Sequence, residues 1–503
     1  MVDKGKQGAD ENLPSDLSQS VEIFRNRLGK SSDFKAREII LPGESSPVAV
    51  ICYFNGLVDL KSINKMVATV NDFLLGEKQG KPSPSSIEDM IPGDLRKSGN
   101  IDNLIQAMLD GSTVMLIDGI SSAAIVSLPG GERRAVEEPS SQTVIRGPKE
   151  GFTEDVTTNI ALIRRKIRSP KLRFEDRTIG KVTKTRVSVA YIEGVAKEEV
   201  VKEVFARLDR IDVDSILESG YIEEYIQDVT ATPFPTIINT ERPDAVAGNL
   251  LDGQVAILVD GSPFVLVAPV TFFKFFLASE DYYQRFDISS FLRLIRLFSF
   301  LVALLLPSLY IAVTTFQQEM IPTTLLISLA AQREGTPLPA LLEALLMELT
   351  FEVIREAGVR MPRVVGPAIS IVGALVLGQA AVQAGLVSAA MVIIVSFTAI
   401  SNFVIPYFSM SAAVRLVRFA LMLLAGSFGL YGILAGGIPL LIHMVSLKSF
   451  GVPYFLPLAP LSFTNLKDVL IRAPWPLLKT RPSYISSDNR GRQASKRQGK
   501  NSK

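Results

Sequence analysis

Two stretches of this chain share one pattern: residues 107–129 read AMLDGSTVMLIDGISSAAIVSLP, and residues 250–270 read LLDGQVAILVDGSPFVLVAPV. Each contains Leu-Asp-Gly, a short apolar run, a second Asp-Gly and another apolar run. Asp-Gly tolerates the positive φ angles of a tight turn, so each stretch predicts the end of a helix followed by a β-hairpin. The same hairpin is therefore expected at two places.

The sequence before each hairpin also repeats. Residues 48–60, VAVICYFNGLVDL, and residues 186–195, RVSVAYIEGV, both predict a strand that ends near a glycine, and a helical pattern follows each. Strand, glycine, helix and double Asp-Gly hairpin recur in the same order at an offset of roughly 140 residues, which is the signature of an internal duplication. We expect two related α/β subdomains in the N-terminal half.

The second half of the chain has long segments without charge. No Asp, Glu, Lys or Arg occurs in residues 297–318, 364–414 or 419–447. A helix that spans a bilayer needs about 20 mostly apolar residues, so these lengths predict one, two and one crossings. Lys and Arg beside membrane helices favour the cytoplasmic side, and with four crossings only some of those in this half would lie there. Six crossings therefore remain the alternative to four.

Composition shifts divide the chain into five parts. The fold class expected is a mixed α/β soluble N-terminal half followed by an α-helical membrane domain with several spans. The predicted parts are a disordered tail at 1–20, a first α/β subdomain at 21–145, a second α/β subdomain with its linker helix at 146–285, a transmembrane domain at 286–470, and a basic cytoplasmic tail at 471–503. The polar N-terminus has no apolar signal region, so the N-terminal half is expected in the cytoplasm.

Composition argues against several classes of function. The 53 Lys and Arg residues nearly balance the 51 Asp and Glu residues, so bulk charge gives no support to nucleic-acid binding. A single cysteine, Cys52, and a single histidine, His443, exclude a disulfide framework and a Cys/His zinc site. Phosphate-binding loops and nucleophile motifs are missing as well. We expect no enzyme, no catalytic residues, no metal and no cofactor.

A helix predicted within residues 153–169 places acids first and bases last, which complements the helix dipole. Its basic end contains Arg164, Arg165, Lys166 and Arg168. These side chains fit an anion site, or equally the solvated or subunit-facing end of a helix.

Two features of the membrane half carry chemistry. Pro307 lies in the first predicted span, where it removes a backbone hydrogen bond unless a neighbour satisfies the freed carbonyl. Glu348, Glu352 and Glu356 then follow one another at four-residue spacing along one helical stripe. In an oligomer this stripe would form rings of carboxylates that attract cations. The alternative is an interfacial helix whose acids pair with Arg355, Arg360 and Arg363.

The span that follows Arg363 is rich in Gly, Ala and Ser and carries the neutral polar residues Ser370 and Gln379. Such a span fits either a close packing seam between helices or a pore wall. The last apolar segment is expected to break at Gly436-Gly437.

Several long motifs resemble the A subunit of spore germination receptors of the GerA family. They include RGPKEGFTED, DGQVAILVDGSPFVLVAPVTF, QEMIPTTLLISLAAQREGTPLP, EALLMELTFEVIREAGVRMP and GPAISIVGALVLGQAAVQAGLVS. The resemblance covers roughly residues 20–485. It implies a protein of the spore inner membrane whose N-terminal half and C-terminal tail face the cytoplasm, or spore core.

The resemblance also implies partners and a mechanism. The partners would be a transporter-like B subunit, which binds the nutrient, and a lipoprotein C subunit. The A subunit would form a homo-oligomer, a pentamer, that acts as a nutrient-gated channel for monovalent cations. The pore elements would fall on the acidic helix 338–356 and the span from Arg363, with Glu348 and Glu352 attracting cations, and Ser370, Val372 and Gln379 lining the constriction. The alternatives are a non-conducting scaffold subunit and a secondary transporter. The sequence does not identify the nutrient.

Overall fold

The structure is a computed structural model, and it describes residues 12–41, 46–76, 95–128, 130, 139, 142–361, 376–482, 484–486 and 491–492. The chain forms two compact units. The sheet unit comprises Met1–Gln227, Asn239–Pro269 and Lys479–Lys503, and the helical unit comprises Asp228–Ile238 and Val270–Leu478.

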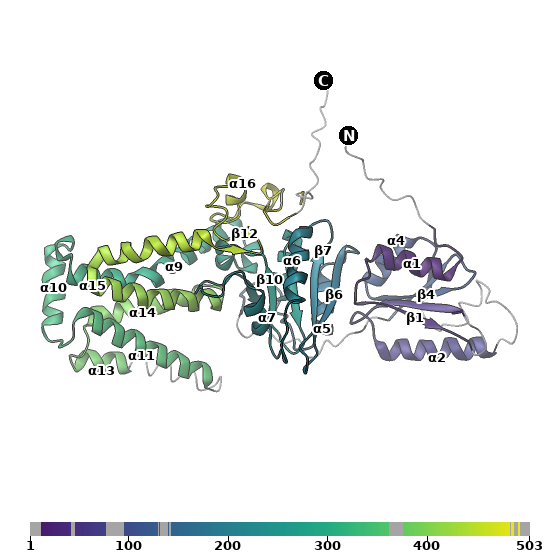
Figure 1. Ribbon diagram of the computed structural model, residues 1–503, viewed down its shortest axis with the longest axis horizontal. Coiled ribbons are helices and arrows are strands. Elements are labelled where there is room, and N and C mark those ends of the chain that lie inside the picture. Colours follow the sequence, from purple (N-terminus) through teal and green to yellow (C-terminus); the bar gives the residue numbers. More distant parts are fainter. Residues whose placement is uncertain are drawn as a thin grey trace, which may run out of the picture. The chain divides into compact units, whose positions relative to one another are not determined.

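The first half of the sheet unit is a five-stranded antiparallel sheet with the strand order β1-β2-β4-β5-β3. Its elements in chain order are α1 (Leu17–Arg27), β1 (Phe34–Ile39), β2 (Ala49–Phe54), α2 (Leu60–Gly76), β3 (Leu95–Ser98), α4 (Ile101–Leu109), β4 (Ser112–Ile117) and β5 (Ala123–Ser127). Figure 1 shows α1 and α4 on one face of this sheet and α2 on the other.

Strand β2 is buried along its whole length because helices cover both faces of the sheet. Successive side chains of a strand point to opposite faces. Val50, Cys52 and Phe54 therefore pack with α1 and α4, and Ile51 and Tyr53 pack with α2. Burial raises the pKa of the Cys52 thiol to about 12, which keeps it protonated and unreactive near neutral pH. Cys52 is thus a small core residue, as its apolar context predicts.

The second sheet has the same strand order, β6-β7-β9-β10-β8. Its elements are α5 (Val156–Lys166), β6 (Leu172–Ile179), β7 (Thr185–Ile192), α6 (Glu198–Leu208), α7 (Ser219–Ile226), β8 (Ile238–Thr240), α8 (Pro243–Asp252), β9 (Val255–Val259) and β10 (Val265–Ala268). Only α7 lacks a counterpart among the described elements of the first sheet. The equal topology confirms the two related α/β subdomains.

The two Asp-Gly turns are equivalent in detail. Gly119 and Gly261 have φ angles of +82° and +87°, which glycine adopts without strain. The Gly119 amide donates to the Ser15 carbonyl over 2.9 Å, and the Gly261 amide donates to the Glu154 carbonyl over 2.8 Å. Both acceptors directly precede the residue that caps the first helix of their repeat. Each turn therefore ties a hairpin to the start of its own subdomain.

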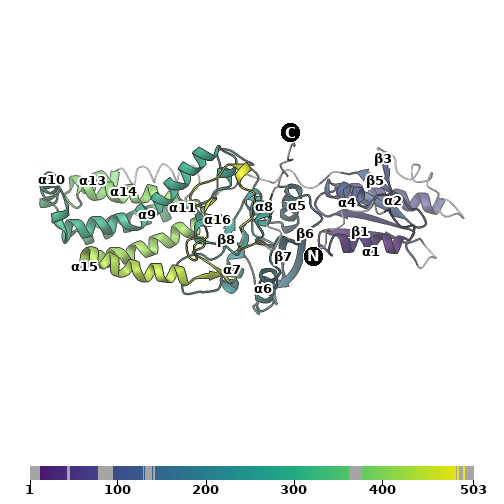
Figure 2. The ribbon, with the colours of Figure 1, turned by 90° about the horizontal axis from the view of Figure 1, so that it is seen from above.

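The helical unit is built from α9 (Phe286–Thr315), α10 (Thr323–Glu334), α11 (Ala340–Arg360), α13 (Gly378–Gln383), α14 (Ala389–Phe403) and α15 (Phe408–Ser446). Its short elements are η1 (Phe272–Phe276), η2 (Ser279–Tyr282), η3 (Gln318–Met320), β11 (Lys448–Ser449), β12 (Val452–Pro453), α16 (Phe463–Leu466) and η5 (Trp475–Leu477). Helices α9, α14 and α15 run side by side, and α10 crosses the end of this bundle (Figures 1 and 2).

Two described helices, α9 and α15, are long and apolar enough to cross a membrane, and α14 is a shorter apolar helix. Helix α15 contains a sharp reversal at Gly429, whose φ and ψ angles are 61° and −142°. A Cβ on Gly436 would lie 2.6 Å from Leu424 Cδ1, although twelve residues of straight helix span about 18 Å. Residues 408–428 and 430–446 therefore form a helical hairpin.

The predicted break at Gly436-Gly437 is wrong. Gly436 lies inside the second arm of the hairpin, where the lack of a side chain lets Leu421 and Leu424 approach. The break falls at Gly429, whose backbone angles are open only to glycine. The Gln317 side chain accepts from the freed Leu430 amide over 3.2 Å, which stabilises the reversal. Residues 419–447, for which a single crossing is expected, therefore include the reversal between the two arms.

Candidate functional site

The acidic residues of α11 lie in different environments. Glu348 is 1 % exposed and Glu352 20 %, whereas Glu356 is 61 % exposed and pairs with Arg360 at the surface. Each step of four residues rotates a side chain by about 40° around a helix. The predicted stripe therefore begins inside the helical unit and ends on its surface.

Glu348 forms a buried ion pair with Arg418 of α15, with 2.8 Å between Oε2 and Nη2. Nη1 of Arg418 also donates to the Ala303 carbonyl of α9 over 3.2 Å. Ala303 lies four residues before Pro307, which has no amide hydrogen, so this carbonyl has lost its helical donor. Arg418 is thus the neighbour that satisfies the carbonyl freed by Pro307, and it joins α9, α11 and α15.

Glu352 is held by two more arginines. Its Oε2 lies 2.6 Å from Arg355 Nη2 and 2.8 Å from Arg415 Nη1. The expected pairing of these acids with nearby arginines is therefore present at Arg355 and, on the surface, at Arg360; Arg363 lies outside the described residues. Sequence reasoning missed Arg415 and Arg418 as partners. Their signal was available: two cations three residues apart, directly before the uncharged segment 419–447.

A third glutamate, Glu343, belongs to the same helix and is completely buried. Its Oε1 accepts from the amide and the hydroxyl of Ser388, at 2.5 and 2.6 Å, and Ser388 in turn caps α14. In the described part of the chain, Glu343 Oε2, Glu348 Oε1 and Glu352 Oε1 are buried without a hydrogen-bond partner. Helix α11 therefore carries three acids, each with one carboxylate oxygen that accepts no hydrogen bond from the described residues; that of Glu352 lies 3.9 Å from Arg418 Nη2.

The residues predicted for the constriction are only partly described. Ser370 and Val372 lie outside the described residues. Gln379 lies on the exposed surface of α13, and no hydrogen bond in the described chain joins it to Glu348 or Glu352. The structure thus groups the two predicted glutamates with each other, and not with Gln379.

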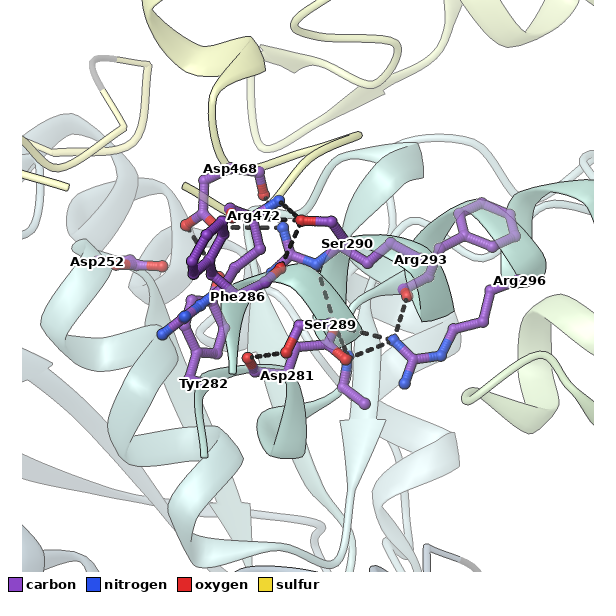
Figure 3. A network of polar contacts seen from close by, with 12 residues as sticks. Asp252, Asp281, Tyr282, Phe286, Ser289, Ser290, Arg293, Arg296, Asp468 and Arg472 are labelled. Atoms are coloured by element: carbon purple, nitrogen blue, oxygen red, sulfur yellow. Dashed lines mark hydrogen bonds and ion pairs between the residues drawn. The ribbon is translucent and has the colours of Figure 1, made fainter. Parts of the chain in front are cut away.

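A second buried charge network lies where α9 begins (Figure 3). Asp281, which is fully buried, accepts from Arg293 Nε over 3.1 Å and from Arg296 Nη1 over 2.8 Å. Arg293 Nη1 also donates to Asp468 Oδ1 over 3.1 Å, so a segment near the end of the chain is joined to α9.

The basic end of α5 is structural and offers no open anion site in the described chain. Arg164 is 1 % exposed and donates to both carboxylate oxygens of Asp33, at 2.9 and 3.0 Å. Lys166 pairs with Glu150, and Arg168 pairs with Asp110. The helix end is therefore occupied by partners within the sheet unit.

Comparison with known proteins identifies the family. Residues 22–484 match the family model described as Bacillus/Clostridium GerA spore germination protein. The chain is 47% identical over 481 residues to spore germination protein KA of Bacillus subtilis (strain 168), covering 95% of this chain and 88% of that protein. It is 40% identical to spore germination protein GerLA of Bacillus cereus, covering 94% and 96%.

Among solved structures, the chain is similar to the N-terminal domain of the A subunit of the Bacillus megaterium spore germinant receptor GerK3. The identity is 38%, the TM-score is 0.42, and the match covers 53% of this chain and 99% of that chain.

The protein belongs to the GerA family of spore germination proteins. It is an A subunit of a spore germinant receptor, a membrane protein with long apolar helices, and not an enzyme. Membership in this family implies a receptor complex that also contains B and C subunits.

Proposed function

We propose that this A subunit forms a homo-oligomer, a pentamer, that conducts monovalent cations across the spore inner membrane when a nutrient binds the receptor. In this proposal the N-terminal half and the C-terminal tail face the spore core. The nutrient binds the transporter-like B subunit, and the lipoprotein C subunit completes the complex. The resulting efflux of cations starts germination.

The observation that carries the proposal is the set of inward acids on α11. Charged groups inside an apolar helical bundle are costly, and in membrane proteins they mark ion pathways. Glu343 and Glu348 are at least 99 % buried, and each keeps one carboxylate oxygen without a partner in the described chain. Oxygen ligands of this kind attract cations. Oligomerisation would repeat the three acids around an axis.

The arginines around these acids suggest how conduction is controlled. In this conformation Arg418 neutralises Glu348, and Arg355 and Arg415 neutralise Glu352. Nutrient binding favours conduction only if it favours a second conformation in which these pairs are loosened. Glu348 and Glu352 would then attract cations, while Ser370, Val372 and Gln379 line the constriction, with Val372 as its apolar gate.

Two alternatives predict different behaviour. Secondary transporters are typically built from repeats within the membrane half, whereas the repeat of this chain lies in the sheet unit. A scaffold subunit would hold the B and C subunits together without conducting. Sequence and family are equally compatible with a scaffold, so flux measurement has to separate the two.

The test uses the A, B and C subunits reconstituted together in potassium-loaded liposomes. We expect nutrient-dependent potassium release from the native complex. The variant Glu348→Gln/Arg418→Gln removes an acid without leaving its arginine unpaired. Glu352→Gln removes the acid that pairs with Arg355 and Arg415, whose side chains are 15 % and 13 % exposed. Each should lower the nutrient-dependent flux about tenfold, which corresponds to about 1.4 kcal/mol of lost cation stabilisation.

The matched control is Glu356→Gln, which changes an acid on the exposed face of the same helix. It should leave the flux unchanged. An assembled complex that conducts nothing would favour the scaffold. Native flux in both Glu348 and Glu352 variants would show that these acids serve only to hold the helices together.

A further inference from the structure

The charge network at the start of α9 contains more cations than it can pair. Arg293, Arg296 and Arg472 are 3, 7 and 3 % exposed, and the described residues supply only two carboxylates that pair with them, Asp281 and Asp468. Asp281 is shared by Arg293 and Arg296, and Asp468 binds Arg293. Arg472 has no carboxylate partner among the described residues. One buried positive charge therefore remains unbalanced.

The backbone around Arg472 fixes its place against α9. The Arg472 amide donates to Ser290 Oγ over 3.1 Å, and Ser290 Oγ contacts the Arg472 carbonyl at 3.3 Å. Figure 3 shows Arg472 beside Ser290, with Asp468 and Arg293 close by. The guanidinium is thus held at the network by its own main chain, without help from an acid.

The side chain of Arg472 lies against two aromatic rings. Its Cζ atom is 5.4 Å from the centre of the Trp475 ring and 5.8 Å from that of Tyr282. Arg293 also places its Cζ atom 5.4 Å from the centre of the Tyr282 ring. Two guanidinium groups therefore share one tyrosine. The face of an aromatic ring stabilises a cation by about 0.5–2 kcal/mol. It does not accept the hydrogen bonds that the N–H groups of the guanidinium donate in their own plane.

Three buried donors of these arginines are unsatisfied in the described chain: Nε and Nη2 of Arg472 and Nη2 of Arg293. A buried donor without a partner costs about 1–3 kcal/mol, and more when it is charged. A partner with several acceptor oxygens would satisfy these donors, and phosphate is such an anion, which arginine binds through two parallel hydrogen bonds.

The surroundings indicate where such a phosphate comes from. Exposed apolar side chains border the network on both segments: Phe291 and Leu294 on α9, and Ile471, Trp475 and Leu477 near the end of the chain. Helix α9 continues from here into its apolar part. Aromatic and basic residues at the end of a membrane helix lie at headgroup depth, and basic pockets there bind anionic lipids.

We propose that Arg472, with Arg293 and the Tyr282 and Trp475 rings, binds the headgroup phosphate of an anionic phospholipid. The bound phosphate neutralises the extra charge and accepts the free N–H donors. Acyl chains would lie along the exposed apolar side chains of α9. This site is independent of the proposed cation path, because it concerns lipid selectivity and not conduction.

The experiment measures lipid retention by the full chain, purified in detergent with its partner subunits, using native mass spectrometry and thermal unfolding. The probes are phosphatidylglycerol, phosphatidylcholine and inorganic phosphate at equal ionic strength. We expect phosphatidylglycerol to be retained at least about tenfold better than phosphatidylcholine and to raise the unfolding temperature. That ratio corresponds to roughly 1.4 kcal/mol of binding preference. Inorganic phosphate should have little effect.

Arg472→Gln should remove the preference for phosphatidylglycerol, and Arg285→Gln, which changes an arginine that is 77 % exposed, should retain it. Equal retention of the two lipids by the native protein would overturn the proposal, whatever the variants do. Stabilisation by inorganic phosphate alone would overturn the lipid as the source of the anion. A full preference in Arg472→Gln would place the lipid elsewhere on the protein.

Discussion

Glu223 on α7 is a titratable residue with an unusual environment. Burial, reinforced by the nearby charge of Glu218, raises its pKa to about 7, against the opposing effect of a hydrogen bond from Asn239. The folded protein therefore keeps this proton between about pH 4.5 and 7, whereas the unfolded chain releases it. The contribution of Glu223 to the free energy of unfolding therefore falls as the pH rises from about 4.5 to 7, and it stays low above pH 7.

We accordingly expect Glu223→Gln to stabilise the protein above pH 7. The amide imitates the protonated acid, so the gain should reach about 1–2 kcal/mol at pH 8, allowing for partial exposure, and disappear below pH 4.5. The measurement is the unfolding temperature of the full chain in detergent as a function of pH. Glu224→Gln, on the exposed neighbour, is the control. A stabilisation that did not vary with pH would contradict the raised pKa.

Sequence reasoning at this scale succeeded where the chemistry was local. Pro307 necessarily frees the carbonyl four residues earlier, so a satisfying neighbour could be predicted. Which neighbour supplies the donor could not, because Arg418 lies 115 residues beyond Ala303. The same holds for Glu348. The energetic cost of an acid at membrane depth follows from the residue type alone, whereas the burial of Glu348 against Arg418 depends on how α9, α11 and α15 pack together.

The element that decides the shape of the last apolar segment is the reversal at Gly429. A Cβ at this position would lie 2.7 Å from Gln317 Oε1 and 2.8 Å from Phe316 Cβ, in addition to the strain of a φ angle of +61°. We expect Gly429→Ala to destabilise the helical hairpin by about 1–3 kcal/mol and to lower the amount of protein in the membrane.

The matched control is Gly437→Ala in the second arm of the hairpin, where a Cβ meets no atom within 4 Å. This change should preserve or raise the amount of protein, since alanine favours a helix over glycine. Quantitative immunoblots of membrane fractions and the unfolding temperature in detergent give the comparison. Equal losses in both variants would refute the assignment of the reversal to Gly429.

The elements of the sheet unit were more predictable than those of the helical unit, for a physical reason. Asp-Gly turns and helix ends depend on a few neighbouring residues, and their repetition revealed the two subdomains. The strand order places β3 beside β5, and that pairing depends on contacts between distant segments. In the helical unit, glycines at 429, 436 and 437 look alike in sequence, and only packing decides which one breaks the helix.

At the scale of the whole molecule, duplication poses a problem of attachment, because two similar subdomains must be held together within one unit. Arg164 of the second repeat and Asp33 of the first are both nearly inaccessible, and their two parallel hydrogen bonds join the repeats. Arg164 also donates to the Ser169 and Leu172 carbonyls and lies over the rings of Phe54 and Phe174. The arginine is therefore bound by both subdomains.

Removing one partner should leave the other charge buried and unpaired. We expect Asp33→Ala to destabilise the sheet unit by about 3–5 kcal/mol and to reduce the amount of full-length protein sharply. Asp110→Ala, which breaks the exposed pair with Arg168, should cost less than about 1 kcal/mol. Both are measured as the unfolding temperature of the full chain in detergent and as its abundance in membranes.

A second variant separates the charge from the packing at this joint. Replacing both partners, as Asp33→Leu with Arg164→Met, removes the unpaired charge while keeping apolar volume against Phe54 and Phe174, so part of the lost stability should return. If the double variant is as unstable as Asp33→Ala, the joint depends on the hydrogen bonds of Arg164 to the second repeat. If Asp33→Ala behaves like Asp110→Ala, the two repeats are held together by other contacts, and the buried pair is not what attaches them.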